Sequence, residues 1–328
     1  MLTLIALIVA GTCAVVTQPF VQPVASSAPP VDAGRLEAHV RHLSVDLYPR
    51  SFEQVRNTER AAQYIFDELK AAGGEVSVQE VSVEEAKYKN IIARFGPGNG
   101  PVLVIGAHYD AHGDVALGAA DARGHTADSH TPGADDNASG VAGLIELARL
   151  LAAQPPKQAV ELVAYALEEP PHFRTEHMGS AWHARMLRES GRALRMMISL
   201  EMIGYFSDAP GSQHYPVPAM SALYPDRGNF IAIVGKLENF SAMRRIKSIM
   251  RGATDLPVYS TNAPRMIPGV DFSDHLNYWD AGLPALMVTD TAFMRNQNYH
   301  RAGDTYDTLD YARMAKVVQA VFAVTQLY

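Results

Sequence analysis

The chain has 328 residues, of which 48% are hydrophobic and 19% are charged, so it carries enough apolar material for a large globular core. Its formal net charge of -7 excludes the basic excess that nucleic-acid binding requires. Its single cysteine, Cys13, excludes an intrachain disulfide and a thiolate metal site.

The N-terminus begins with an apolar run, Leu2–Val16, which is shorter than the roughly 20 residues that span a bilayer. The run is typical of the apolar core of a secretory signal, although no Lys or Arg precedes it. The following stretch, 18–33, is rich in Pro, Ser and Ala and indicates a linker with nothing to pack against.

We therefore expect residues 1–33 to be a signal or anchor with its linker, and residues 34–328 to form one folded domain. Cleavage sites are suggested at 12–14 and at 25–27, and an uncleaved membrane anchor is the alternative. In each case the domain is expected outside the cytoplasm, as a secreted, periplasmic or anchored protein.

Along the domain, the sequence alternates predicted helices and strands. A helical pattern at Asn57–Ala72, with Asn57 as a cap, precedes two alternating segments, Glu75–Val83 and Tyr88–Phe95, expected to pair antiparallel. Short apolar runs then predict buried strands at Val102–Ile105, Val160–Ala166, Met196–Leu200, Phe230–Val234 and Ala285–Val288. Helices are expected between several of them, at Ser139–Ala153, Gly179–Glu189 and Phe240–Met250.

This alternation predicts an α/β fold, a three-layer sandwich with a mixed, largely parallel central sheet and helices on both faces. In such sheets, ligands bind beyond the carboxyl ends of the strands. The strand Val102–Ile105 leads directly to His108 and Asp110. A histidine there is a good zinc ligand, and a carboxylate beside it can fix its tautomer; the alternative is a satisfied core histidine.

Acidic residues follow other predicted elements. Asp135 and Asp136 precede the helix from Ser139, where they could cap the helix or bridge two metal ions. Glu168 and Glu169 follow a buried strand, and two adjacent carboxylates resist burial unless a cation is near. One of this pair could bind metal while the other acts as general base, and the alternative is a solvated loop.

Glu201 follows the strand Met196–Leu200, and His300 lies in a loop before the terminal helix. Two Zn²⁺ bring four positive charges, which are balanced by Asp136, Glu169, Glu201 and one hydroxide, with two neutral histidines. A neutral cluster is the least costly to bury. The oxygen and nitrogen donors suit zinc best.

Five segments in this order resemble the double-zinc aminopeptidases of the bacterial leucyl aminopeptidase type, metallopeptidase family twenty-eight, whose wider family also holds glutamate carboxypeptidases and glutaminyl cyclases. The segments are Gly-Ala-His-Tyr-Asp at 106–110, Gly-Ala-Asp-Asp-Asn-Ala-Ser-Gly at 133–140, Glu168-Glu169, Ser-Leu-Glu-Met-Ile-Gly-Tyr at 199–205, and His300 before Asp304-Thr305. The resemblance extends from about Arg35 to the C-terminus. It implies the zinc exopeptidase fold, with residues 34–328 as a di-zinc peptidase domain.

The resemblance also implies a role for each residue. His108 and Glu201 would hold one zinc ion, Glu169 and His300 the other, and Asp136 would bridge the two. The peptide bond from Asp136 to Asn137 would be cis. For catalysis, Glu168 would be the general base and Asp110 would orient His108.

The expected activity is hydrolysis of peptide substrates by an aminopeptidase that uses two zinc ions. Many aminopeptidases of the family have Asp where this chain has Glu201, which keeps a carboxypeptidase as an alternative. Glutaminyl cyclase-like acyl transfer with one zinc, and a non-catalytic binding protein on the same fold, are the others. The oligomeric state is not predicted.

The connection 111–135 is longer than the family pattern and carries several histidines and aspartates: His112, Asp114, Asp121, His125, Asp128 and His130. It is interpreted as a solvated surface insertion, with a lid or an accessory metal site as the alternative. Residues 207–228 and 271–279 are candidates for the rim of the substrate pocket.

Overall fold

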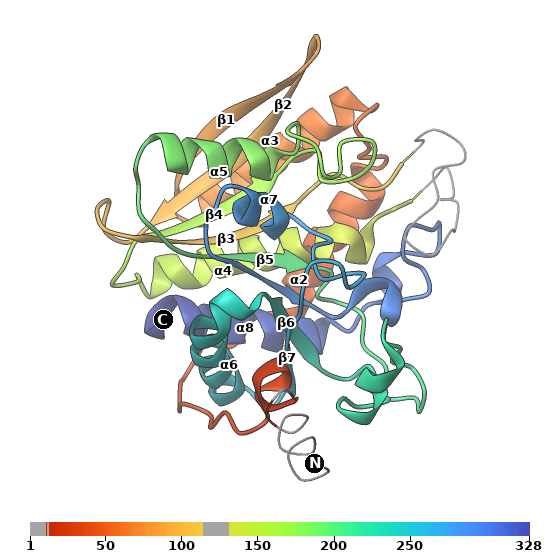
Figure 1. Cartoon of the computed structure of the whole chain (residues 1–328). Helices are drawn as coiled ribbons and strands as arrows, with labels where there is room; N and C mark the ends of the chain where they lie inside the picture. The colour runs from red at the N-terminus through yellow and green to blue at the C-terminus, as the bar shows by residue number, and fades with distance from the viewer. Residues whose placement is uncertain (1–10, 12, 114–130) are drawn as a thin grey trace.

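The computed structural model describes residues 11, 13–113 and 131–328 of the chain. These residues form one eight-stranded sheet between two layers of helices (Figure 1). The strands are β1 (Glu75–Val83), β2 (Ala86–Phe95), β3 (Val102–His108), β4 (Val160–Tyr165), β5 (Leu194–Glu201), β6 (Ile231–Gly235), β7 (Val258–Asn262) and β8 (Ala285–Thr289). The helices are α2 (Ala33–Arg41), α3 (Val55–Ala71), α4 (Gly140–Ala153), α5 (Gly179–Glu189), α6 (Phe240–Ala253), α7 (His275–Asp280) and α8 (Tyr311–Leu327).

The sheet is mixed, with a parallel central part. Its strand order is β1-β2-β4-β3-β5-β8-β6-β7. Strands β4, β3, β5 and β8 run parallel to one another, and β6 runs parallel to β7. The pairs β1–β2, β2–β4 and β6–β8 are antiparallel. The expected α/β sandwich with a largely parallel sheet is confirmed, and so is the antiparallel pair at its edge.

Different helices bury the two faces of the sheet. Helices α2, α3, α4, α6 and α8 cover one face, where Leu103 and Ile105 of β3 enter the larger apolar core. Helices α5 and α7 cover the other face, where Val102 and Val104 enter a smaller core. Because successive side chains of a strand point to opposite faces, a strand covered on both sides is apolar at most of its positions.

Among the helices and strands given above, α2, α7 and β7 were not predicted from the sequence. Strand β7 reads Val-Tyr-Ser-Thr-Asn, which is not an unbroken apolar run. Among the described strands it pairs only with β6, at the end of the sheet order. The prediction that Asn57 caps a helix is wrong. Helix α3 begins at Val55, and the Asn57 side-chain amide donates to the Tyr48 carbonyl at 3.2 Å.

A buried carboxylate, Glu161 of β4, is paired with two arginines and a histidine. Arg94 Nε lies 2.8 Å from its Oε1, Arg192 contacts the same oxygen, and His183 Nε2 lies 3.4 Å from Oε2. Burial alone would raise the pKa of Glu161, but His183 and the two arginines lower it to about 2. Because the pKa of Glu161 in the folded protein is lower than its ordinary value of 4.5, these contacts stabilise the fold at pH values above about 4.5.

The N-terminal segment 13–24 packs against α6, so the expectation of a linker with nothing to pack against is wrong there. The buried ammonium of Lys247 donates to the main-chain carbonyls of Thr17, at 2.8 Å, and Gln18, at 3.1 Å. The side chain of Val21 is also buried. Main-chain carbonyls can accept hydrogen bonds whatever the residue type, so nothing in the sequence of this segment indicates the contact.

The predicted signal run, Leu2–Val16, lies mostly outside the described residues. Within the part of the chain that the structure does describe, none of the helices combines the length and the apolar character needed to cross a membrane.

Candidate metal centre

The carboxyl ends of adjacent parallel strands bring the expected site residues to one edge of the sheet. Strand β3 ends at His108, β5 ends at Glu201, and Glu168 and Glu169 follow β4. These strands are neighbours and run in the same direction, so their carboxyl ends meet. Leu167, at the turn after β4, has a φ of +61°, a left-handed conformation that non-glycine residues adopt mainly where the surrounding structure imposes it.

His108, Asp136 and Glu201 form a first group of buried candidate ligands, whose ligand atoms lie within 4.8 Å of one another. His108 Nε2 lies 3.3 Å from Asp136 Oδ1 and 3.4 Å from Glu201 Oε2. In a tetrahedral zinc site with bonds of about 2.0–2.1 Å, neighbouring ligand atoms are about 3.3 Å apart. The spacing within this group therefore suits one zinc ion.

His112, Glu169 and His300 form a second buried group of the same kind. His300 Nε2 lies 3.3 Å from Glu169 Oε2 and 3.1 Å from Asp136 Oδ2. The two oxygens of Asp136 thus face different groups, Oδ1 toward His108 and Oδ2 toward His300. This is the placement that a carboxylate needs in order to bridge two ions.

Unpaired polar atoms at the centre also fit bound cations. Among the described residues, His108 Nε2, Glu169 Oε1 and Glu201 Oε2 are buried and find no hydrogen-bond partner. Leaving such atoms unpaired is costly, so their presence points to a ligand between them. The available donors are nitrogen and oxygen, which zinc accepts in four-coordinate sites.

The charges of the cluster are strongly coupled. Burial raises the pKa of Glu168 well above its ordinary value, and the neighbouring carboxylates of Glu201 and Glu169 raise it further. Burial raises the pKa of Glu169 to about 7. Burial alone would lower the pKa of His300, but Glu169 and Asp136 raise it to about 10. Metal ions that bind here would therefore compete with protons for these groups.

Asp110 lies beside His108 as expected, although its carboxylate mainly supports the turn after β4. Its Oδ1 accepts the Glu168 N–H at 3.1 Å and its Oδ2 accepts the Glu169 N–H at 3.0 Å. His108 Nδ1 lies 3.1 Å from the main-chain carbonyl of Asp110 and 3.5 Å from its carboxylate. The nearer acceptor for the histidine is thus the main-chain carbonyl.

Asn137 connects the turn before α4 to the end of β5. Its side-chain amide donates to the Leu200 carbonyl at 2.8 Å, and its oxygen accepts the Met202 N–H at 3.1 Å. These residues flank Glu201, so Asn137 fixes Glu201 relative to Asp136. The Asp136–Asn137 peptide bond is cis, as the resemblance implied. The sequence pattern contained Asn137 but gave no reason for this contact.

Two further residues position the centre without being predicted to do so. Asp304 accepts the main-chain N–H groups of Asp135, at 2.8 Å, and Asp136, at 3.1 Å. The guanidinium of Arg50 is buried and donates to the carbonyls of Tyr109, at 3.0 Å, and Gly133, at 2.8 Å. Arg50 thus joins the two chain segments on either side of the long connection, although no motif marks it in the sequence.

An apolar cavity opens beside Glu201. Its wall includes Phe230 and Tyr259 from the region of β6 and β7, and Phe293 from the loop after β8. Of the described residues that line it, none is a lysine or an arginine. The expected rim segments contribute in part, through Tyr215, Pro216, Met220 and Tyr224 from 207–228 and Phe272 from 271–279.

A family model for peptidase family M28 matches residues 90–325, which is most of the chain. The chain belongs to peptidase family M28. The family indicated by the five sequence segments is therefore confirmed. M28 membership makes the cluster at the strand ends the candidate catalytic centre of a metallo-exopeptidase.

Relatives of this M28 member align with most of its length. It is 51% identical over 311 residues to uncharacterized protein YfbL of Escherichia coli, covering 95% of this chain and 92% of that protein. It is 28% identical over 298 residues to a protein named probable leucine aminopeptidase of Arthroderma otae, covering 86% of this chain and 69% of the relative.

Solved structures share the fold. One is a Zn-dependent exopeptidase from Parabacteroides distasonis, with a TM-score of 0.64 and 19% identity, covering 92% of this chain and 100% of the other. Another is a glutaminyl cyclase from Bacteroides thetaiotaomicron, with a TM-score of 0.65 and 20% identity, covering 90% of this chain and 98% of the other. The expected zinc exopeptidase fold is confirmed.

Proposed function

We propose that the chain is an aminopeptidase that removes the N-terminal residue of peptides and uses two zinc ions. The observation that carries this proposal is a buried cluster of two ligand groups that share Asp136, next to an apolar cavity. His108 and Glu201 would hold one ion, Glu169 and His300 the other. Membership of family M28 supports the reaction class.

Bound zinc would supply a Lewis acid for the scissile carbonyl and would lower the pKa of water. Glu168 belongs to neither ligand group, yet its Oε2 lies 3.8 Å from His108 Nε2 and faces the same centre. We assign it the role of general base, which takes the proton of the attacking water and delivers it to the leaving amine. Asp110, whose carboxylate accepts the Glu168 N–H, would hold this base in place.

The cavity supports attack from the N-terminus. A carboxypeptidase must bind a terminal carboxylate, for which a cationic side chain is the usual partner, and the described lining offers neither lysine nor arginine. An aminopeptidase must bind a terminal ammonium, and the carboxylate of Glu201 is part of the cavity wall. The N-terminal side chain would then enter an apolar, aromatic pocket, which favours large apolar residues.

We also propose that the protein works outside the cytoplasm and keeps residues 15–24 after any processing. The apolar run at the N-terminus supports export. Cleavage at 25–27 would remove the Thr17 and Gln18 carbonyls, two of the acceptors that the described residues offer the buried Lys247 ammonium. The proposal therefore favours cleavage at 12–14 or an uncleaved anchor, and N-terminal sequencing of the exported protein would distinguish these two outcomes.

The activity is tested with the purified, zinc-loaded protein and matched peptides that differ only at their ends. We expect cleavage of Leu-Ala-Ala and of its C-terminal amide, and no cleavage of the N-acetylated peptide. Cleavage of the acetylated peptide together with refusal of the amide would identify a carboxypeptidase instead. Cyclisation of peptides with N-terminal Gln, without hydrolysis, would identify a glutaminyl cyclase, and bound metal without turnover would identify a binding protein.

A further inference from the structure

We propose that His112 is an additional protein ligand of the second zinc ion, beside Glu169, His300 and Asp136. This inference rests on the proposed di-zinc function. His112 precedes the part of the 111–135 connection that lies outside the described residues, where Asp114, Asp121, His125, Asp128 and His130 are found. An accessory metal site was one of the alternatives for this connection, and the present proposal assigns metal binding to one of its histidines.

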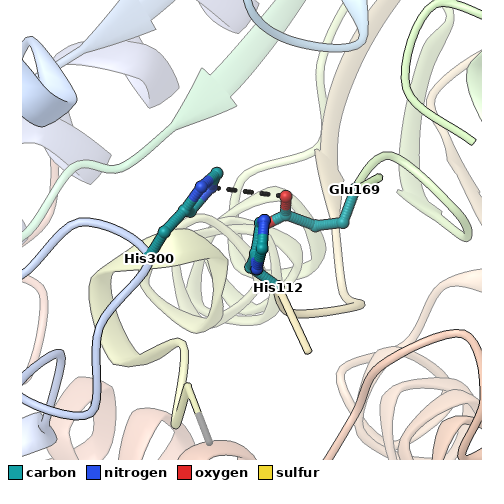
Figure 2. Close-up of side chains that lie close together, drawn as sticks. All are labelled: His112, Glu169 and His300. Carbon is teal, nitrogen blue, oxygen red and sulfur yellow. Dashed lines mark ion pairs between the residues drawn. The ribbon is translucent and has the colours of Figure 1, made fainter. Parts of the chain in front are cut away.

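The geometry places His112 within the second ligand group. A ring nitrogen of His112 lies within 4.8 Å of the ligand atoms of Glu169 and His300, and all three residues are buried. The ring centroids of His112 and His300 are 4.0 Å apart. Figure 2 shows both imidazoles beside the carboxylate of Glu169, so the three side chains surround one small space.

The fold fixes the backbone on both sides of His112. The Ala111 N–H donates to the Arg50 carbonyl at 3.3 Å. Gly113 packs closely on Ser51, the residue that follows Arg50. A Cβ atom added to Gly113 would lie 2.0 Å from the Ser51 Cβ. His112 is therefore held in the centre by its neighbours rather than reaching it from a loose surface loop.

With His112 included, the two ions would have different coordination. The second ion would have four protein donors, His112, His300, Glu169 and Asp136, which complete a tetrahedral shell. The first ion would have three, and its ligand Glu201 lines the apolar cavity. Structural zinc sites are closed, whereas catalytic sites keep a position for water or substrate. The first ion would therefore be the one with a position left for water or substrate.

A cysteine at position 112 tests direct coordination. In the Cys13→Ser background, which removes the only natural thiol, His112→Cys is prepared metal-free and titrated with Co²⁺. A thiolate bound to Co²⁺ gives an intense near-ultraviolet charge-transfer absorption that nitrogen and oxygen ligands do not give. We expect this band in His112→Cys and its absence in Cys13→Ser alone. Two bound Co²⁺ without the band would overturn the proposal.

Zinc affinity gives a second test that does not depend on the cysteine variant folding. Loss of a metal-supporting contact outside the ligand set weakens binding by about 10–100-fold, so loss of a ligand should weaken it by at least about 100-fold. In competition with a chromophoric chelator, His112→Gln should show this loss at one site and none at the other. His177→Gln, which changes a half-buried histidine outside both ligand groups, should bind zinc as the parent does.

The outcomes separate this inference from the proposed function. A parent protein that binds no zinc would contradict both. A parent that binds two zinc ions, with His112→Gln binding both at unchanged affinity, would overturn the role of His112 alone. Thermal unfolding of the metal-free proteins checks that the variants are folded when the affinities are compared.

Discussion

Removal of residues 1–25 should destabilise the folded domain, because the segment 13–24 supplies contacts to a buried charge. Lys247 Nζ donates to three oxygens, of Thr17, Gln18 and Ser260, and the truncation removes the first two. A hydrogen bond to a charged group contributes about 1.5–3 kcal/mol, so the two lost bonds correspond to about 3–6 kcal/mol. Water that reaches the exposed ammonium will reduce this figure.

The loss is large relative to the stability of an ordinary domain, about 5–15 kcal/mol. The assay is urea unfolding of the chain 26–328 against the chain 13–328, which retains Thr17 and Gln18. In the truncated chain, Lys247→Met should recover much of the loss because it removes the charge and keeps the apolar stem. Equal unfolding midpoints for the two chains would refute the argument that segment 13–24 is part of the fold.

Three further predictions concern single side chains. Glu168→Gln should keep both zinc ions and lower kcat by at least about 100-fold, whereas Glu169→Gln should lower zinc affinity. A near-normal kcat for Glu168→Gln would show that Glu168 is not the general base. Ala232→Phe, which fills the apolar cavity from β6, should lower kcat/KM for leucyl peptides by at least about 10-fold more than for alanyl peptides, and equal losses would count against the pocket assignment. The stability supplied by Glu161 is present above about pH 4.5 and is lost as the pH falls toward its folded pKa of about 2. Glu161→Gln should therefore unfold more easily at neutral pH and should lose less further stability than the parent on acidification; parallel urea midpoints from about pH 6 to about pH 3 would disprove this.

Much of the fold could be predicted from the sequence because the central strands are buried on both faces. The apolar runs that end near Ile105, Leu200 and Val288 all became strands of the sheet. The edge strand β7 could not be identified this way, since its polar residues Ser260, Thr261 and Asn262 interrupt the apolar pattern. Helix α7 has only six residues, His275–Asp280, which is too short for a clear helical period.

The candidate ligands could be anticipated because His108 and Glu201 directly follow apolar runs, where a polar side chain calls for an explanation. His112 could not be singled out, since it is one of six similar residues in a long connection. The hydrogen bond from Ala111 to Arg50 and the close packing of Gly113 on Ser51 bring it into the centre. The partners of Arg50 and Lys247 are main-chain carbonyls. Such contacts depend on where the chain passes and not on residue type, so no motif predicts them.

The central claim is that two zinc ions, held by the shared cluster around Asp136, are required for peptide hydrolysis. The most direct measurement adds zinc stepwise to chelator-stripped protein and follows bound zinc and hydrolysis of a free N-terminal leucyl peptide in the same sample. We expect binding to saturate at about two zinc ions per chain, with full activity only as the second equivalent binds. Full hydrolysis by the metal-free protein, or no zinc bound at saturation, would contradict the account.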